Sequence, residues 1–466
     1  MASLNKFKFL IKKTSVLLIF VALLLSVLPQ PARAVTNPNV LAKSALLVEH
    51  NSGTVLYEKN KDEQRPADSL TKVMALLVAV TECEKGNVKV TDLIKMTESA
   101  WGGLNSSSTT LDITPGEEMA LLDLMYCAYT GAASEAGNMI AEHVAGSVED
   151  YVAMMNALAR ELGCENTNFV NTHGEARSNQ YTSAWDQYLI YSKAMESSLF
   201  ADISGTYKYK VPQTNTAEVR SLTSSNYMLN ESGKYYYRYC TGGKPSATYE
   251  GGYSLVASAE REGFYLVSVV LGSQAVILED ESTQMQNLTE TRRLFEWAFS
   301  EFSWKTVISS SELVAKVPVL FGDGADFVNL RPVSSVSMLI HNDVKVSEFE
   351  KEIKLYSQES GETLTAPVRV GDALGEITLT YNGKNYGAIK LVANTSIGLQ
   401  RIEYIKAQLK KLMATPAVKI GFAVLLLLFA AYIVLVVRYN IHRRRHMQRV
   451  AEAKRKIIED RQRTNK

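Results

Sequence analysis

Ser69 and Lys72 are the two side chains whose types and spacing could do chemistry together. They lie three residues apart, near the start of an apolar run that ends near Val80. On a helix this spacing places the two side chains on one face, one turn apart. A serine hydroxyl is a weak nucleophile until a base takes its proton, and a lysine whose pKa is lowered by burial can be that base. The pair therefore predicts nucleophilic catalysis through a covalent intermediate on Ser69.

The neighbouring residues predict the helix that positions this pair. Pro66 and Asp68 are typical of a helix start, and Gly86 is typical of a helix end. Ser69 would then lie in the first turn, where free N–H groups and the helix dipole favour an anion.

The Ser-x-x-Lys spacing is weak evidence when it stands alone. It occurs a second time in this chain, at Ser3 and Lys6. A purely structural interpretation makes Ser69 a helix cap and Lys72 a surface charge. The rest of the chain has to decide between the two interpretations.

The composition excludes several classes of protein. A chain of 466 residues should hold more than one domain, and 46% hydrophobic residues with 21% charged residues exclude wholesale disorder. A net charge of +1 gives no general reason to expect nucleic acid binding. The four cysteines are widely separated, without a Cys-x-x-Cys pair, so we expect no metal site and predict no cofactor.

Residues 1–34 have the pattern of a secretory signal peptide. Lysines precede an apolar run from Val16 to Leu28, and the small-x-small sequence 32–34 follows. We expect cleavage after Ala34. An uncleaved anchor is the alternative, but the apolar run is short for a membrane span.

Residues 417–437 predict one membrane-spanning helix, because Ile420 to Val437 is an unbroken uncharged run. The tail 438–466 is basic and is therefore expected on the cytoplasmic side. Nucleic acid binding is a more specific alternative role for these basic residues, but membrane topology and contact with lipid headgroups already explain them. We predict a single-pass cell-membrane protein whose body lies on the outer side, joined to the span by a linker at 399–416.

The body of the chain predicts an α+β domain followed by a β domain. Short strands at 44–48 and 54–57 form a hairpin, and helical periodicity follows at 121–129, 134–145 and 148–162. Further strands are expected at 235–239, 253–258 and 264–271, before a last helix at 289–302. Helices between early and late strands favour packing on an antiparallel sheet, here over 35–303. Residues 304–398 predict a small β-sandwich.

Several longer stretches resemble the low-molecular-mass penicillin-binding proteins, the serine-type D-alanyl-D-alanine carboxypeptidases. The likeness runs from about Asn39 to Ala393, nearly the whole predicted outer region. The matching stretches lie at 53–60, 65–74, 114–117, 169–174, 181–186, 239–244, 255–259 and 366–371. The resemblance implies a transpeptidase-like catalytic domain followed by the family's second domain.

The resemblance also implies the chemistry. Ser69 would attack the carbonyl between the two terminal D-alanines of a peptidoglycan stem peptide, with Lys72 as the base, and β-lactams would acylate Ser69 by mimicry. The oxyanion hole would use the backbone N–H groups of Ser69 and Ala247. Lys244 would attract the substrate carboxylate.

Two further family motifs depart from their pattern. The Ser-x-Asn motif falls on 132–134, where Ala132 replaces the serine and Ser134 replaces the asparagine. The Lys-Thr-Gly motif falls on 244–246, where Pro245 and Ser246 replace threonine and glycine. Ser134 could accept hydrogen bonds from a substrate or cap the next helix.

Losses of this kind commonly cost about 10²- to 10³-fold in rate, so reduced activity is expected. The leading hypothesis is a membrane-anchored D,D-carboxypeptidase. A non-catalytic homologue that binds wall peptides or β-lactams is the second hypothesis. A β-lactamase is the third, although the β domain and the span serve no obvious purpose there.

Overall fold

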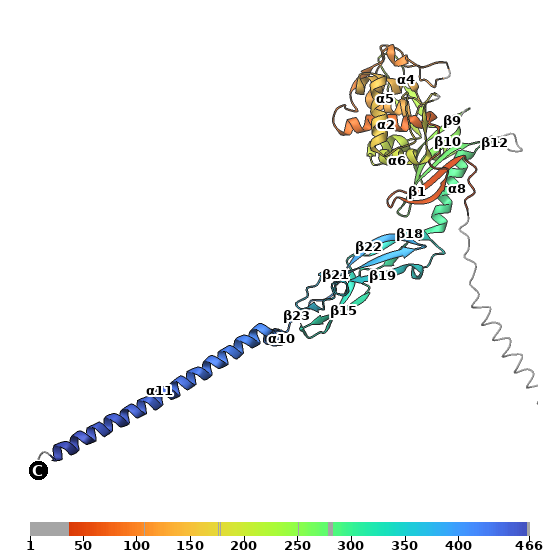
Figure 1. Ribbon diagram of the computed structural model, residues 1–466. Coiled ribbons are helices and arrows are strands. Elements are labelled where there is room, and N and C mark those ends of the chain that lie inside the picture. Colours follow the sequence, from red (N-terminus) through yellow and green to blue (C-terminus); the bar gives the residue numbers. More distant parts are fainter. Residues whose placement is uncertain are drawn as a thin grey trace, which may run out of the picture. The chain divides into compact units, whose positions relative to one another are not determined.

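The computed structural model describes residues 37–463, apart from 107, 176, 178, 250 and 278–282. The predicted signal peptide 1–34 lies outside the described residues. The described chain divides into two compact units, and the division falls within β14 (Phe302–Ile308) and β18 (Val336–His341). Figure 1 shows the two units, which are described one at a time below.

The first unit is built on a five-stranded antiparallel sheet in the order β2-β1-β11-β10-β9. Alternate side chains of each inner strand enter two different hydrophobic cores, because successive residues of a strand face opposite sides. In β1, Leu46 faces the helical bundle, whereas Leu47 faces α8. The strands are β1 (Ser44–Glu49), β2 (Thr54–Lys59), β9 (Cys240–Thr248), β10 (Gly252–Arg261) and β11 (Phe264–Ser273).

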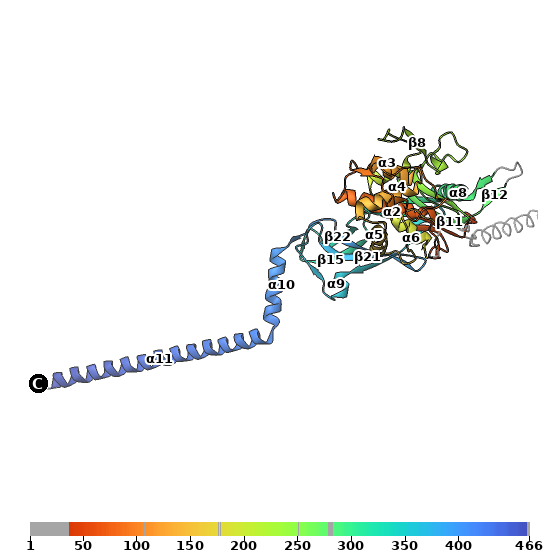
Figure 2. The ribbon, with the colours of Figure 1, turned by 90° about the horizontal axis from the view of Figure 1, so that it is seen from above.

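Helices cover both faces of this sheet (Figures 1 and 2). Helix α8 packs on β10 and β11 from one side, and α6 packs on β1 and β11 from the other. The central helix α2 is almost entirely buried, which fits its nearly uninterrupted apolar sequence. The helices are α2 (Thr71–Glu84), α3 (Leu121–Tyr129), α4 (Ser134–Ala145), α5 (Val148–Glu161), α6 (Ala184–Met195), α7 (Ser198–Gly205) and α8 (Gln286–Glu301).

Local sequence signals set the ends of several helices. Ser147 caps α5 by accepting a hydrogen bond from Asp150 N, and Ser183 caps α6 in the same way from Asp186 N. Helix α4 ends at Gly146, whose φ of 84° is easily adopted only by glycine. Short paired strands join these elements: β3 (Arg65–Pro66) with β6 (Tyr181–Thr182), β4 (Leu93–Lys95) with β5 (Glu118–Ala120), β7 (Lys208–Val211) with β8 (Arg220–Thr223), and β12 (Ala275–Ile277) with β13 (Thr283–Met285).

The strand expected at 235–239 is wrong, because these residues form turns and the strand begins at Cys240. Aromatic residues favour strands, but here the rings pack on α8 instead of entering a ladder. Tyr237 is buried and stacks on Phe295 with ring centres 6.0 Å apart, and Tyr239 packs against Phe299 at 6.1 Å.

The second unit holds the β domain. Its six-stranded sheet runs in the order β19-β21-β22-β17-β15-β20 and is antiparallel except where β15 meets β20. A β domain here confirms the prediction. Its strands are β15 (Ala315–Leu320), β16 (Gly322–Asp323), β17 (Phe327–Pro332), β19 (Glu350–Leu355), β20 (Leu364–Thr365), β21 (Ala373–Tyr381), β22 (Lys384–Ala393) and β23 (Gly398–Leu399), with the one-turn helix α9 (Tyr356–Glu359).

Two helices close the chain, α10 (Arg401–Ala414) and the 48-residue α11 (Pro416–Arg463). Among the described residues, α11 is the helix long and apolar enough to cross a membrane. The expected span 417–437 is its first part, and the basic residues continue in the same helix.

All four cysteines are free thiols. Burial raises the pKa of Cys83 to about 11 and those of Cys127, Cys164 and Cys240 to about 12.

Candidate active site

Ser69 lies in a 3₁₀ turn, Asp68–Leu70, that leads directly into α2. The turn begins at Asp68, as the sequence predicted, but no side chain caps it. The Asp68 carboxylate instead accepts a hydrogen bond from Thr248 Oγ1 at 2.8 Å. This bond ties the residue before Ser69 to strand β9.

Lys72 is the second residue of α2 and is 5% exposed. Its Nζ donates a hydrogen bond to the carbonyl of His173. Burial lowers the pKa of Lys72 to about 8, against the opposing charges of Glu175 and Glu135. A lower pKa increases the neutral fraction of Lys72 at physiological pH, and only the neutral amine can accept a proton.

Gly174, which follows the His173 carbonyl that binds Lys72, lies close to the turn that holds Ser69. Gly174 has a φ of 88°, and a Cβ there would lie 2.0 Å from the carbonyl oxygen of Asp68. Only glycine permits this approach. The adjacent Glu175 accepts hydrogen bonds from Asn105 Nδ2, at 2.9 Å, and from Ser108 Oγ, so it also holds the loop before β5.

His173 itself is neutral at physiological pH. Burial and the positive charges of Lys72 and Arg177 lower the pKa of the His173 imidazole to about 3. The imidazole therefore carries no positive charge at neutral pH beside Lys72.

Strand β9 forms the other wall of the site. Lys244 is 3% exposed, and its Nζ donates to the carbonyl of Tyr129 and lies 5.0 Å from the centre of that ring. Burial, followed by the charge of Lys72, holds the pKa of Lys244 well below its ordinary value. A carboxylate bound beside Lys244 would raise this pKa, because a nearby anion favours the protonated form.

Buried hydroxyl groups hold strand β9 in place next to Lys244 through hydrogen bonds. Ser204 Oγ accepts a hydrogen bond from Gly243 N at 3.0 Å and lies 3.2 Å from the Tyr129 hydroxyl. Tyr191 continues this chain of hydroxyl groups, with its oxygen 3.3 Å from Ser204 Oγ and 3.0 Å from Ser258 Oγ.

Ser246 contacts the backbone of Ser69. Ser69 N donates a hydrogen bond to Ser246 Oγ at 3.1 Å, across 177 positions of sequence. Sequence reasoning noted Ser246 as a departure from the motif but did not find this contact. Ala247 follows in β9 and is exposed; alternation places its side chain on the opposite face of the strand.

Ser134 is the first residue of α4 and is 3% exposed, but Ala133 holds the cap position without a side-chain hydrogen bond. The cap interpretation of Ser134 is therefore wrong. Asn138, one turn later, was missed by sequence reasoning: it accepts a hydrogen bond from Thr172 Oγ1 at 2.7 Å and donates to the carbonyl of Ala100 at 2.9 Å. It joins α4 to the residue before His173.

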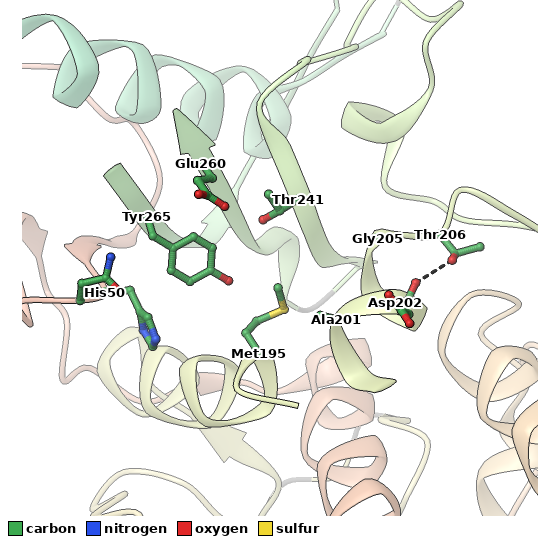
Figure 3. Close-up of a pocket in the computed structure, with 10 residues that line it drawn as sticks. His50, Met195, Ala201, Asp202, Gly205, Thr206, Thr241, Glu260 and Tyr265 are labelled. Carbon is green, nitrogen blue, oxygen red and sulfur yellow. Dashed lines mark hydrogen bonds between the residues drawn. The ribbon is translucent and has the colours of Figure 1, made fainter. Parts of the chain in front are cut away.

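A wide cavity of about 680 Å³ lies at the other end of β9. Figure 3 shows His50, Thr241, Glu260 and Tyr265 around it. Thr241 is near the start of the strand, whereas Ser246, which contacts Ser69, is near its end, so this cavity is separate from Ser69. Within the described ranges, no three His, Cys, Asp or Glu side chains gather as a metal site.

Comparison with known families decides the assignment. Residues 31–275 match the D-alanyl-D-alanine carboxypeptidase family, and residues 302–398 match the C-terminal domain of penicillin-binding protein 5. The chain belongs to the D-alanyl-D-alanine carboxypeptidase family. It is therefore a peptidase of a penicillin-binding family that acts on D-Ala-D-Ala peptides of peptidoglycan, which confirms the predicted fold and activity.

Individual relatives cover most of the chain. The D-alanyl-D-alanine carboxypeptidase DacC of Escherichia coli is 30% identical over 362 residues, covering 76% of this chain and 83% of that one. DacF of Bacillus subtilis is 28% identical over 343 residues, covering 74% and 82%. The crystal structure of penicillin-binding protein 5 from Haemophilus influenzae superposes with a TM-score of 0.58 at 26% identity, covering 78% of this chain and 100% of that chain. These likenesses give no support to a non-catalytic homologue.

Proposed function

We propose that Ser69 is the nucleophile and Lys72 the general base with which this carboxypeptidase removes the terminal D-Ala of stem peptides. The observation that carries the proposal is the state of Lys72, a buried lysine with a pKa of about 8, one turn from a partly exposed serine. Burial disfavours the ammonium form, so the base is active near neutral pH without a partner imidazole.

The proposed reaction has two halves. Neutral Lys72 takes the Ser69 hydroxyl proton while Oγ attacks the carbonyl carbon of the penultimate D-Ala. The backbone N–H groups of Ser69 and Ala247 hold the negative oxygen of the tetrahedral intermediate. The carbon–nitrogen bond then breaks, and the leaving D-Ala amine takes the proton from Lys72. Water cleaves the resulting ester with the same base and releases the shortened peptide.

Lys244 is proposed to hold the terminal carboxylate of the peptide. A carboxylate that enters beside this buried lysine would raise its pKa and complete an ion pair. β-Lactams carry a carboxylate next to a strained amide, so they should occupy the same position and acylate Ser69. Ser134 is buried at the start of α4 and is proposed as a minor polar contact of the substrate.

The site is tested by acylation and turnover of the full-length protein in detergent. We expect a fluorescent penicillin to label the wild-type chain and Ser69→Ala to abolish the label. Release of D-Ala from a Lys-D-Ala-D-Ala peptide should be lost in the same variant. Ser311→Ala, which changes an exposed serine of the β domain, should leave both signals unchanged. Equal D-Ala release by wild type and Ser69→Ala would refute the proposal.

The topology is part of the proposal. Residues 1–34 are removed, 35–303 and 304–398 lie on the wall side, 399–416 link them to the span 417–437, and 438–466 lie in the cytoplasm. The apolar start of α11 followed by its basic end supports this orientation. Protease added to intact cells should degrade the body of the protein but spare a tag placed after Lys466. Loss of that tag would show that the C-terminal end lies outside the cell, which would contradict the proposed orientation.

A further inference from the structure

The hydroxyl of Ser246 binds the Ser69 backbone N–H, which the proposed reaction needs as a free donor for the oxyanion. Its Oγ accepts a hydrogen bond from Ser69 N at 3.1 Å, and the side chain is 4% exposed. A second bond, from Thr248 Oγ1 to the Asp68 carboxylate at 2.8 Å, holds the same strand against the same turn. The Ser246 contact is therefore one of two points that fix β9 beside the nucleophile.

The donor in this contact is the nucleophile's own backbone N–H. An oxyanion-hole donor must lie about 2.7–3.1 Å from the oxygen that becomes negative. Ser246 Oγ is already at that distance from Ser69 N. Because two oxygens cannot occupy the same position on one N–H, the substrate carbonyl and the Ser246 hydroxyl exclude each other.

We propose that Ser246 is a plug of the oxyanion hole, which binds the Ser69 N–H in the resting protein and must rotate away before acylation. The inference rests on the proposed role of Ser69. Serine has three staggered rotamers, so the hydroxyl can leave by a single bond rotation without movement of the strand. The contact therefore lowers the population of protein that is ready to react, and it does not alter the nucleophile or the base.

The alternative is that the hydroxyl stays and donates its own proton to the oxyanion. The observed contact favours the plug, because Oγ accepts from Ser69 N and so lies on the path of that N–H. As a plug, the hydroxyl slows acylation by the strength of one net hydrogen bond, about 2- to 10-fold. As an extra donor, it would accelerate acylation by a similar factor.

The kinetic test measures the second-order rate constant of acylation by a fluorescent penicillin, on the full-length chain in detergent. Ser246→Ala and Ser246→Gly should each raise this constant about 2- to 10-fold. The matched control is Ser254→Ala, because Ser254 lies opposite Ser246 in β10, is equally buried, and bonds Gly272 N instead of Ser69 N. The control should match the wild type. A slower Ser246→Ala reaction, or an unchanged one, would overturn the proposal.

A second measurement does not depend on the reaction. In a Ser69→Ala background the backbone N–H remains but no acylation can occur. Site-resolved hydrogen exchange of residue 69 should then be faster when Ser246→Ala is added, and unchanged when Ser254→Ala is added. If penicillin fails to label the wild type, the proposed function is wrong. If labelling occurs but hydrogen exchange at residue 69 is unchanged by Ser246→Ala, the proposed role of Ser246 is wrong.

Discussion

Helix α2 and strand β9 meet at Ser69, but they differ in how their polar groups are used. Lys72 on the helix is buried, has a lowered pKa, and lies one turn from Ser69, the proposed nucleophile. On the strand, Lys244 bonds the carbonyl of Tyr129, and Ser246 bonds Ser69 N. Lys72 also bonds a backbone carbonyl, that of His173, but it does not bind the Ser69 backbone N–H, whereas Ser246 on the strand does.

This difference separates the two tasks of the site. A substrate that binds along β9 must exchange existing hydrogen bonds for new ones, which costs binding free energy. Neutral Lys72 can keep its hydrogen bond to the His173 carbonyl while its lone pair takes the Ser69 proton, so activation of Ser69 needs no such exchange. Changes on the helix should therefore act mainly on the chemical step, and changes on the strand should act mainly on binding and on entry into the oxyanion hole.

The largest effect is expected from the helix. Lys72→Ala should lower the rate of acylation by about 10³-fold or more, because the Ser69 hydroxyl loses its base. Lys72→Arg should not restore it, since a guanidinium stays protonated at any pH that the protein tolerates. Stopped-flow acylation with a fluorescent penicillin measures both. Recovery of more than a tenth of the rate by Lys72→Arg would show that Lys72 acts only as a positive charge.

A smaller loss is expected from the strand. Lys244→Met keeps the length and apolar bulk of the side chain but removes the ammonium group. We expect kcat/KM for a Lys-D-Ala-D-Ala peptide to fall about 10²-fold, through the loss of the carboxylate partner. Lys208→Met, on the exposed side of β7, is the control. The same fall with a substrate that lacks the terminal carboxylate would contradict the assigned role.

Repair of the strand should produce a gain. Pro245→Thr combined with Ser246→Gly restores the family motif at this site, and we expect D-Ala release to rise about 10-fold. Comparison with Ser246→Gly alone separates the removal of the plug from the return of the threonine hydroxyl. An unchanged turnover would mean that these two positions do not limit the reaction.

The smallest effect is expected from the loop beside Lys72. The charge of Glu175 raises the pKa of Lys72 against the effect of burial, so Glu175→Gln should lower that pKa. Acylation depends on neutral Lys72 and rises with pH through this pKa. The profile should therefore shift to lower pH, with a gain of about 2- to 5-fold at pH 7. Glu142→Gln, whose carboxylate accepts from Thr97 Oγ1, should leave the profile in place. A shift to higher pH would contradict the electrostatic role of Glu175.

The sequence predicts the local part of this site and misses the long-range part. The spacing of Ser69 and Lys72 lies within one helical turn, and the apolar pattern after them specifies α2, so both could be placed from neighbouring residues. The contact between Ser69 and Ser246 joins positions 177 apart, and no local period encodes it.

The same limit explains the fold errors. The first hairpin and helices α3 to α5 follow from periodicity, but Tyr235 to Tyr239 did not form a strand, because α8 supplies a surface for their rings. Asn138 was missed for a similar reason. Its partners Ala100 and Thr172 come from two distant loops.

The four unpaired thiols have a consequence for spectroscopy. Thiolates are the species that react with maleimides and iodoacetamides, and burial keeps all four cysteines of this chain protonated at neutral pH. A cysteine introduced at an exposed position, such as Tyr249, should outcompete them for a fluorescent dye. The unmodified sequence is therefore a suitable starting point for such labelling, because its own cysteines should react little with the dye. Two introduced cysteines, one at Tyr249 after β9 and one in the β domain, would carry a dye pair that reports the distance between them in a lipid bilayer.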